Sequence, residues 1–328
     1  MSTARVALAV DGGASKTDVV VLDLPSGYVL GRARGPGCSH HQLGIEVAVQ
    51  VLDETVSRAL GSTARTPRDV AVAGCYLTAV DLEEETADLT AALARTEWAR
   101  ERLTVDNDVF ALLRTGTDAA DAAVVVCGTG INAAAVRADG ARERVLSLGR
   151  VSGDWGGGSG LADAVLWHAA RAEDGRGPET TLRQALLEWT GRDSVHDVSV
   201  DVHLGRLSVE TWWDRIPDVF ALASAGDRVA RSLVERQGHE VALLAGALLG
   251  RLGLTTRRVP VVLGGGILAS GDARLMAAVR RTLITLAPHA VPTVVQRSPV
   301  LGAALLTLRD AGVDDTALAE AARGLADE

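Results

Sequence analysis

Lysine is almost absent from this chain. Lys16 is the only lysine in 328 residues, and every other cationic side chain is an arginine. Together with the abundance of alanine, glycine and valine, this bias indicates a GC-rich genome, so Lys16 is either functional or left by chance. The 33 basic residues are outnumbered by 42 acidic ones, which gives a net charge of −9. A chain without an excess of positive charge is not expected to have nucleic acid as its main partner.

Cysteine is scarce as well. Cys38, Cys75 and Cys127 stand far apart in the sequence, and no CxxC pair occurs. An odd number of isolated cysteines excludes a disulfide framework and favours a reducing compartment. Cys75 and Cys127 lie in apolar surroundings, where a free cysteine behaves as a small buried hydrophobe.

Long hydrophobic runs are also missing. No apolar stretch approaches the roughly 18 residues that a membrane span requires, and no signal peptide is recognised before the first apolar run at Val6. We therefore expect a cytoplasmic protein without a membrane partner. No low-complexity linker interrupts the chain, and 328 residues, 47% of them hydrophobic, suffice for two domains with large cores.

A glycine-rich turn near the start is the most informative motif that is present. The apolar run 6–10 ends in Asp11-Gly12-Gly13-Ala14-Ser15-Lys16-Thr17-Asp18, and a second apolar run over 19–22 follows at once. Two β-branched runs joined by such a turn predict a β-hairpin. Small residues let backbone N–H groups approach an anion. Ser15, Lys16 and Thr17 add side-chain donors, and a carboxylate such as Asp11 is suited to a Mg²⁺ beside that anion. An ordinary hairpin turn is the alternative, and the P-loop pattern GxxxxGK[ST] is absent.

The same arrangement recurs later in the chain. The apolar run 123–127 leads into Gly128-Thr129-Gly130-Ile131-Asn132, and a further strand is expected over 133–136. This repetition predicts two similar α/β halves, and two such halves facing each other would bring both turns to one cleft.

The remaining hydrophobic pattern fits this organisation. Apolar residues at helical spacing and helix end signals predict helices over 43–60, 82–95, 108–114, 162–172, 182–189, 209–216, 227–252, 272–286 and 300–309. Further strands are expected over 28–33, 69–74, 103–105, 259–263 and 293–296, with Gly35-Pro36-Gly37 ending the first of them.

Three of these motifs resemble the nucleotide-binding loops of the actin-like, sugar-kinase and Hsp70 ATPases. The turn from Asp11 to Thr17 is similar to their first phosphate loop, Cys127-Gly128-Thr129-Gly130 to the second, and Leu263-Gly264-Gly265-Gly266 to the adenosine loop. More narrowly, nearly the whole chain resembles the BadF/BadG/BcrA/BcrD-type ATPase family, which includes the N-acetylglucosamine kinases. The resemblance implies an α/β fold of two actin-like (ribonuclease H-like) domains. Each would have a mixed five-stranded sheet flanked by helices, with an ATP/sugar cleft between the domains.

The resemblance also implies limits for the domains. Residues 1–115 would form the N-terminal domain, with the first phosphate loop and the sugar loops. Residues 116–298 would form the C-terminal domain, with the second phosphate loop and the adenosine loop. Residues 299–328 would be C-terminal helices that pack back on the N-terminal domain.

The activity implied by the resemblance is an ATP-dependent amino-sugar kinase that uses Mg²⁺. N-acetylglucosamine, converted to its 6-phosphate, is the expected substrate, and glucosamine, N-acetylmannosamine and plain hexoses remain open. A homodimer is implied as well. Gly12, Gly13, Ser15, Lys16 and Thr17, with Gly128, Thr129 and Gly130, would bind phosphates, and Gly264, Gly265 and Gly266 the adenosine. Asp11 would support the metal.

Phosphoryl transfer also needs a base for the attacking hydroxyl. In the family, an aspartate that ends a strand between the two phosphate loops accepts this proton. Asp108 in Val105-Asp106-Asn107-Asp108 matches it best, because a helix is expected to follow directly, and Asp106 is the fallback. The alternative role of Asp106 or Asn107 is to cap that helix.

Several segments match places where the family contacts the sugar. Gly153-Asp154 matches the start of a Gly-Asp-Glu-Gly-Ser stretch, in which Trp155 replaces the glutamate, so the role of that second acid is open. The glycines that follow lead into a helix expected near Leu161, where their N–H groups are suited to an anion or form a flexible loop. Ser39-His40 stands where the family often has Asn-His. Thr78, Asp81 and Asn107 also match the region near the sugar, and solvated loop positions are the alternative for Thr78 and Asp81. A zinc site at His40 and His41 is disfavoured, because adjacent histidines do not easily face one metal and no third ligand has suitable spacing.

Two other functions stay in view. The same family contains ATPase activators of acyl-CoA dehydratases and reductases, whose iron–sulfur cluster needs paired cysteine thiolates, and no Gly-Cys-Gly segment of that kind occurs here. A non-catalytic actin-like regulator is the other alternative. Regulators of the related repressor family usually begin with a helix–turn–helix, whereas this sequence begins at the nucleotide-binding strand.

Overall fold

The structure is a computed structural model that describes residues 5–326, and the chain divides into two compact units. Unit 1 comprises Met1–Ala119 together with Val295–Glu328, and unit 2 comprises Ala120–Val294. The chain thus leaves unit 1, forms all of unit 2, and returns to complete unit 1.

Unit 1 is built on a mixed five-stranded sheet. Its strands, in the order β3-β2-β1-β4-β5, are β3 (Val29–Pro36), β2 (Lys16–Leu24), β1 (Arg5–Gly12), β4 (Val70–Leu77) and β5 (Leu103–Asn107). β1 and β2 form the predicted antiparallel hairpin, β3 pairs antiparallel with β2, and β4 and β5 continue the sheet in parallel with β1. β3 continues to Pro36, whereas the sequence predicted that this strand ends near Ala33. A proline is tolerated there because β3 lies at the sheet edge.

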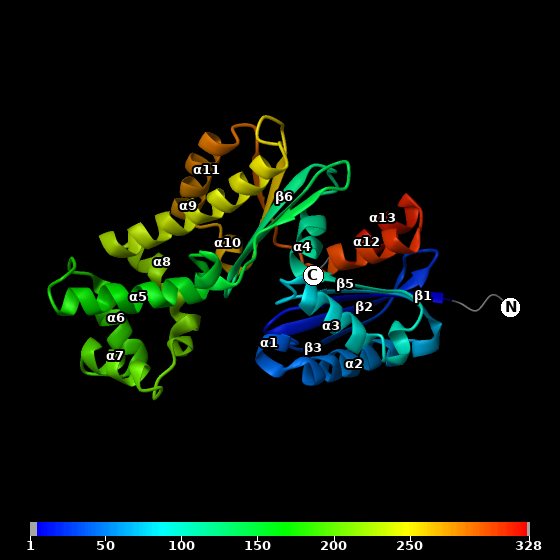
Figure 1. Cartoon of the computed structure of the whole chain (residues 1–328), viewed down its shortest axis with the longest axis horizontal. Helices are drawn as coiled ribbons and strands as arrows, with labels where there is room; N and C mark the ends of the chain where they lie inside the picture. Colours follow the sequence, from blue (N-terminus) through cyan, green and yellow to red (C-terminus); the bar gives the residue numbers. More distant parts are fainter. Residues whose placement is uncertain (1–4, 327–328) are drawn as a thin grey trace. The chain divides into compact units, whose positions relative to one another are not determined.

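Helices cover both faces of this sheet (Figure 1). α2 (Ile45–Gly61) and α3 (Glu83–Leu93) pack against the face that carries Val6, Leu8 and Val10, and the short α1 (His40–Leu43) precedes α2. α4 (Asp108–Gly116), α12 (Val300–Ala311) and α13 (Asp315–Gly324) pack against the face that carries Ala7 and Ala9. Single 3₁₀ turns, η1 (Pro67–Asp69) and η2 (Glu97–Ala99), precede β4 and β5.

Unit 2 repeats the same strand pattern. β6 (Ala122–Cys127), β7 (Ile131–Val136) and β8 (Arg142–Arg144) are antiparallel, and β9 (Pro260–Gly264) and β10 (Val291–Val294) extend the sheet in parallel with β6. The strand order is β10-β9-β6-β7-β8. Read from β8 to β10, it matches the order β3-β2-β1-β4-β5 of unit 1, with β6 in the place of β1. The repetition predicted from the two glycine turns is therefore present in the structure.

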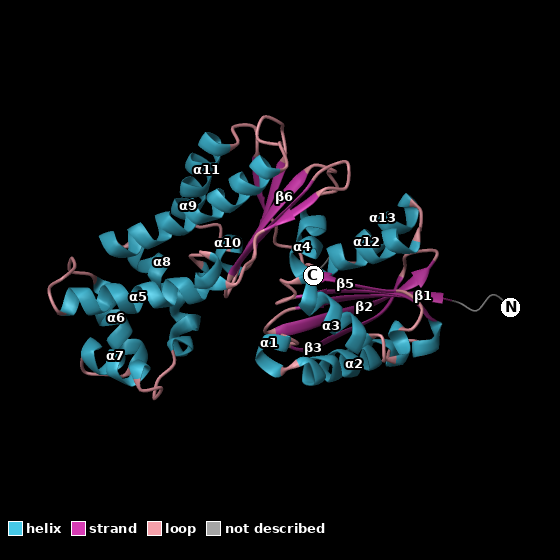
Figure 2. Ribbon diagram, in the orientation of Figure 1, coloured by secondary structure: helices cyan, strands magenta, loops and turns pink. Residues whose placement is uncertain are grey.

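Unit 2 is richer in helix than unit 1 (Figure 2). The helical elements are η3 (Gly149–Ser152), α5 (Gly157–Glu173), α6 (Thr181–Thr190), α7 (Val195–His203), η4 (Val209–Arg215), α8 (Ile216–Ser224), α9 (Arg228–Arg251), α10 (Gly266–Ala269) and α11 (Ala273–Leu286). Several of them depart from the predictions. α5 begins at Gly157 rather than near Leu161, and the helix expected over 209–216 is a 3₁₀ segment with a kink at Trp212. The elements η3, α7, α8 and α10 were not predicted.

These observations confirm the predicted fold class at the level of each unit, a mixed five-stranded sheet flanked by helices. Within residues 5–326, no helix is long and apolar enough to cross a membrane.

Candidate active site

A row of polar side chains crosses the sheet of unit 1 beside the first glycine turn. Strand pairing aligns Arg34 with Asp18, Asp18 with Asp11, Asp11 with Tyr76, and Tyr76 with Asp106. Residues paired across neighbouring strands project from the same face. The turn predicted to bind phosphate therefore has three carboxylates and a guanidinium along one side.

Two cations hold Asp18, the carboxylate of this row that lies next to Arg34. Arg34 donates from Nε to Asp18 Oδ1 at 2.6 Å, and Lys16 Nζ donates to Asp18 Oδ2 at 2.8 Å. Burial alone would raise the pKa of Asp18, but these hydrogen bonds outweigh it and hold the pKa below its ordinary value. Lys16 is thus anchored beside the turn while its side chain stays 45% exposed, which leaves room for a ligand on its outer side.

Asp11 lies in a very different environment from Asp18. It is 8% exposed, and its burial, reinforced by the charges of Asp108 and Asp18 and opposed by Lys16, raises its pKa to about 8. Burial of an ionised carboxylate is unfavourable unless a cation compensates it. Because carboxylate oxygens are the ligands that Mg²⁺ prefers, Asp11 and Asp108 form a donor set that fits such a cation.

The start of α4 positions the predicted base. Asn107 is the N-cap, with its Oδ1 accepting from Val109 N at 3.1 Å, and Asp108 is the first residue of the helix. Asp106 accepts from Asn107 N at 2.8 Å instead of capping α4. Asp106 also lies two strands away from Asp11, or about 10 Å at the usual strand spacing, whereas Asp108 acts electrostatically on Asp11. This geometry favours Asp108 over Asp106 as the acid beside the first turn.

The remaining predicted residues of unit 1 lie in three places. Asp81 and Asn107 meet, because Asn107 Nδ2 donates to Asp81 Oδ1 at 3.0 Å and to Val80 O at 3.0 Å. Thr78 N donates to Gly12 O at 2.7 Å, which ties the end of β4 to the first turn. Ser39 is buried directly before α1, and burial, with the neighbouring His41, lowers the pKa of His40.

Thr17 differs from what the motif predicts. Its side chain is fully buried, and its hydroxyl donates to Pro36 O at 2.8 Å on the neighbouring strand. The structure therefore gives Thr17 a role in pairing β2 with β3, whereas Gly13, Ser15 and Lys16 are the more accessible residues of the turn.

The second glycine turn, in unit 2, is held by the N-terminus of α5. Gly158 N donates to Gly128 O at 2.8 Å, and Ser159 N donates to Thr129 O at 2.9 Å. Gly157 has φ +68 and approaches Gly130 so closely that a Cβ would lie 2.6 Å from the Gly130 carbonyl. Glycine is therefore required where the helix meets the turn.

The expectation that the glycines after Trp155 cradle an anion is wrong. Gly157 N donates to Gln237 Oε1 at 2.9 Å, Gly158 N and Ser159 N donate to the turn, and Gly160 N donates to Gly156 O. All four donors of this helix start are engaged, so the run forms the first turn of α5 and supports the second glycine turn.

The adenosine-loop motif lies beside the second glycine turn. β6 and β9 are parallel neighbours, so Cys127 and Gly264 end at the same edge of the sheet. Gly265 has φ +88, and a Cβ there would meet Cys127 O at 2.4 Å. In contrast, a Cβ on Gly128, Gly130 or Gly266 would meet no atom within 4 Å. The backbone at those three positions is open to a ligand.

Asp154 is held within its own loop. Its Oδ2 accepts from Ser152 Oγ at 2.6 Å and from Gly149 N at 3.0 Å. Trp155, which replaces the glutamate of the resembling motif, stacks under the Arg236 guanidinium at 4.0 Å. The tryptophan therefore has a packing role, and Asp154 presents a fixed carboxylate beside it.

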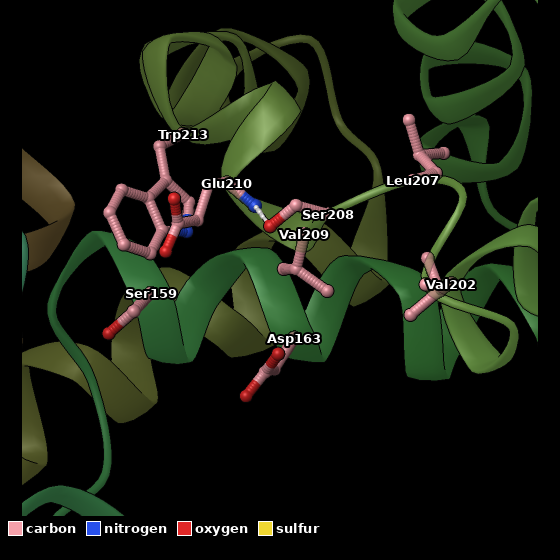
Figure 3. Close-up of a pocket in the computed structure, with 9 residues that line it drawn as sticks. Ser159, Asp163, Val202, Leu207, Ser208, Val209, Glu210 and Trp213 are labelled. Carbon is pink, nitrogen blue, oxygen red and sulfur yellow. Dashed lines mark hydrogen bonds between the residues drawn. The ribbon is translucent and has the colours of Figure 1, made fainter.

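A pocket of about 520 Å³ lies between α5 and the segment that runs from α7 to η4 (Figure 3). Ser159 and Asp163 contribute from α5, and Glu210 and Trp213 from η4. Ser208 Oγ accepts from Glu210 N at 3.2 Å at its rim. None of the predicted site residues lines this pocket. Its lining residue Ser159 donates from its backbone N to Thr129 O of the second glycine turn.

The cysteines do not provide a cluster site. All three are buried free thiols, and Cys38 and Cys75 belong to unit 1 whereas Cys127 belongs to unit 2. Burial raises the pKa of Cys38 to about 11 and of Cys127 to about 12, and it raises the pKa of Cys75 as well. Iron–sulfur ligation requires thiolates, so the activator alternative is not favoured.

Comparison with known proteins decides the family. A model of the BadF/BadG/BcrA/BcrD ATPase family matches residues 8–307. The chain belongs to the BadF/BadG/BcrA/BcrD ATPase family. An N-acetyl-D-glucosamine kinase of Dictyostelium discoideum is 26% identical over 314 residues, covering 93% of this chain and 98% of that protein. An N-acetylmuramic acid/N-acetylglucosamine kinase of Clostridium acetobutylicum is 22% identical over 264 residues, covering 80% of this chain and 86% of that protein.

A solved structure extends this likeness to the fold of the chain. A Chromobacterium violaceum protein assigned as an N-acetylglucosamine kinase superposes with a TM-score of 0.73 at 24% identity, covering 93% of this chain and 99% of that one. The predicted actin-like fold of two domains is thereby confirmed.

Sequence reasoning missed several residues that shape the site. Asp18, Arg34 and Gln237 were not singled out, although Asp18 follows the turn directly and a charged residue inside a β-branched run is itself a signal. Gln237 lies mid-helix, and nothing in its local sequence indicates its contact with Gly157. Glu85 was not singled out either, yet it contacts His41 and accepts hydrogen bonds from the backbone at the start of α3.

Proposed function

We propose that this chain is an ATP-dependent amino-sugar kinase that phosphorylates the 6-hydroxyl of N-acetylglucosamine. The observation that carries the proposal is the acid pair Asp11 and Asp108 beside the first glycine turn. Family membership and the two curated kinase relatives support it.

The nucleotide is proposed to bind through backbone rather than through many side chains. In unit 1, Gly12, Gly13, Ser15 and Lys16 contact phosphate oxygens. In unit 2, the backbone of Gly128, Thr129 and Gly130 lies against the phosphates, and Gly264, Gly265 and Gly266 lie against the adenosine. The open Cβ positions of Gly128, Gly130 and Gly266 support this assignment, because a ligand can approach the backbone there.

Mg²⁺ is proposed at the carboxylate of Asp11, held partly through water, as is usual for this ion. When bound, it neutralises charge that develops on the transferred phosphoryl group. The raised pKa of Asp11 supports the site, because a buried carboxyl of this kind needs a cation to ionise at neutral pH.

Asp108 is proposed to accept the proton of the attacking sugar hydroxyl, with Asp106 as the fallback. The sugar is proposed to contact Ser39, His40, Thr78, Asp81 and Asn107 in unit 1 and Asp154 in unit 2. The hydrogen bond between Asn107 and Asp81 supports a preorganised sugar loop, because it fixes both side chains next to the start of α4.

A homodimer in the cytoplasm completes the proposal. Buried, unpaired thiols are in keeping with a reducing compartment.

Release of ADP against a panel of sugars tests the function. The purified chain receives ATP and Mg²⁺ with N-acetylglucosamine, glucosamine, N-acetylmannosamine, N-acetylmuramic acid or glucose, and ADP is followed by a coupled spectroscopic assay. We expect ADP release to require an amino sugar and to stop when Mg²⁺ is chelated. Mass spectrometry should then detect the phosphorylated sugar. ADP release that is the same without any sugar would instead indicate an ATPase and overturn the proposal.

A further inference from the structure

Two imidazoles and a carboxylate converge where α1 and α3 begin. His40 and His41 open α1, and Glu85 lies in the first turn of α3. One ligand atom from each of the three side chains lies within 4.8 Å of the other two. The sequence separates the histidines from Glu85 widely, so the third ligand that the sequence analysis found missing is supplied by the fold.

Both histidines direct the same atom toward the same oxygen. His41 Nε2 lies 2.6 Å from Glu85 Oε1, and His40 Nε2 lies 4.0 Å from that oxygen. The ring centroids of the two histidines are 4.4 Å apart with an interplanar angle of 61°. Adjacent residues of a helix do not ordinarily face each other, yet these two rings lie in edge-to-face contact.

The inner histidine is the informative member of the group. The His40 side chain is 8% exposed, and its buried Nε2 has no hydrogen-bond partner. A buried polar atom left without a partner destabilises the fold. A ligand that accepts the lone pair of this nitrogen would remove that deficit, and a metal ion is such a ligand.

Glu85 is held in place by its other oxygen. Its Oε2 accepts from Asp81 N at 2.7 Å and from Leu82 N at 2.8 Å. Hydrogen bonds of this kind orient a carboxylate ligand toward a metal. Oε1 is consequently presented to the two imidazoles while Oε2 stays anchored to the backbone.

We propose that His40, His41 and Glu85 bind a divalent transition-metal ion of the Zn²⁺ class. Zn²⁺ bonds of roughly 2.0–2.1 Å at tetrahedral angles place two ligand atoms about 3.3 Å apart. The separations of 2.6 and 4.0 Å lie on either side of that value, each within about 0.7 Å of it. The 2.6 Å separation can lengthen through His41, whose side chain is 49% exposed, and the 4.0 Å separation closes through a small rotation of the Glu85 carboxylate or of the His40 ring.

The donor set selects the metal. Imidazole nitrogens suit Zn²⁺, Ni²⁺, Cu²⁺ and Co²⁺, whereas Mg²⁺ and Ca²⁺ prefer oxygen ligands alone. Three protein ligands leave a fourth position for water or another small ligand. The site therefore differs in chemistry from the Mg²⁺ site proposed at Asp11.

A bound ion would act on the neighbouring loop. Glu85 is bonded to the backbone of Asp81, and the Asp81 side chain accepts from Asn107, the cap of α4. His40 and Asp81 are also proposed sugar contacts. This second consequence rests on the proposed function: metal occupancy should lower the affinity for the sugar, whereas metal binding itself is independent of any kinase activity.

Titration with Co²⁺, a spectroscopic substitute for Zn²⁺, tests the site directly. The full chain is freed of metal with a chelator, and Co²⁺ is added while the visible absorption of a tetrahedral complex is recorded. Calorimetry with Zn²⁺ gives the affinity. We expect one equivalent to bind, and Zn²⁺ to displace Co²⁺.

Variants assign the ion to these residues. His41→Gln and Glu85→Gln should each weaken Zn²⁺ binding by more than the roughly 10–100-fold that losing a supporting hydrogen bond costs. His239→Gln is the matched control, because His239 is an exposed histidine of unit 2 that contacts Thr282 and lies outside the group. Glu85 also caps the start of α3, so circular dichroism is recorded for each variant to check the fold. His41→Gln changes a half-exposed side chain and is expected to leave the fold intact.

Two results would overturn the site. One is wild-type protein that gives no tetrahedral Co²⁺ spectrum. The other is His41→Gln that binds Zn²⁺ as tightly as wild type. Sugar affinity measured with and without Zn²⁺ then tests the coupling separately: unchanged affinity in a protein that does bind the ion would reject the coupling and leave the metal site standing.

Discussion

The two glycine turns share one topology but differ in their surroundings. In unit 1, Gly12 is packed, because a Cβ there would lie 2.5 Å from Cys38 Sγ and 2.6 Å from Leu77 Cδ2. In unit 2, a Cβ on Gly128 or Gly130 would meet nothing within 4 Å. The first turn is flanked by a row of charged side chains, whereas the second is held by backbone N–H groups of α5.

This difference indicates a division of roles between repeated units. The first turn carries the carboxylates that we propose to bind a metal and to accept a proton, and its Gly12 is needed for packing. The second turn carries no such row, and its glycines are needed for access to the backbone. The following predictions test this division.

The largest effect is expected at the carboxylate of Asp108. Asp108→Asn should lower kcat by about 10²–10⁴-fold, because an amide cannot accept the hydroxyl proton. ATP affinity measured by calorimetry should be retained, since both glycine turns remain. Asp106→Asn is the matched control. An inactive Asp106→Asn together with an active Asp108→Asn would assign the base to Asp106 instead.

The next effect concerns the pH dependence of stability in unit 1. Asp11 has a folded pKa of about 8 against an ordinary value of 3.8, so folding takes up a proton between these values. The contribution of Asp11 is therefore greatest at low pH, and stability falls as the pH rises toward 8, by at most about 1.4 kcal/mol per pH unit.

Melting temperatures recorded without Mg²⁺ at pH 5 and pH 8 measure how the ionisation of Asp11 changes the stability. Wild type should lose stability relative to Asp11→Asn over that interval, because the amide does not titrate. Parallel behaviour of the two proteins would mean that Asp11 is already ionised at pH 5.

In unit 2 the carboxylate of Asp154 is expected to affect the sugar. A charge-assisted hydrogen bond is worth about 1.5–3 kcal/mol, so Asp154→Ala should weaken sugar affinity by roughly one to two orders of magnitude. ATP affinity measured without sugar should change little. Because Asp154 also holds Ser152, Ser152→Ala serves as the control for loop loosening. A loss of ATP affinity that occurs only with Mg²⁺ present would make Asp154 a metal ligand instead.

The smallest effects compare the glycines themselves. Gly12→Ala should destabilise the protein by about 1–3 kcal/mol through overpacking against Cys38 and Leu77. Gly130→Ala should leave the melting temperature unchanged and weaken ATP binding about tenfold, or 1.4 kcal/mol. Thermal melts and ATP titrations on both variants check this contrast, and equal destabilisation of the two would remove the distinction between the turns.

Local patterns were sufficient for the strands and the repeated turns. Runs such as 6–10 and 123–127 are β-branched and end in glycine, and the structure has strands there. The start of α5 was missed because Gly157, Gly158 and Gly160 are poor helix formers. Their helical conformation depends on Gln237 and on the carbonyls of the second turn, which are tertiary contacts. α7, in contrast, had a readable signal in Ser194 and Asp197, which cap its start.

The candidate site shows the same limit. The order of the motifs predicted which loops matter, and the helix start predicted Asp108 at the beginning of α4. The sequence did not reveal that Thr17 is buried or that Glu85 meets the two histidines, because each depends on which segments fold together.

The return of the chain to unit 1 has a consequence for synthesis on the ribosome. α12 packs against α4 so closely that a Cβ on Gly302 would lie 1.8 Å from Ala111 O, and Gly27 approaches Ala317 O in the same way. The final helices are thus part of the first domain's core. Domains usually fold in the order in which they emerge, yet here the contiguous unit 2 can be complete while unit 1 still exposes one face of its sheet. Nascent chains that stall before Val300 would leave that apolar face available to chaperones or to aggregation.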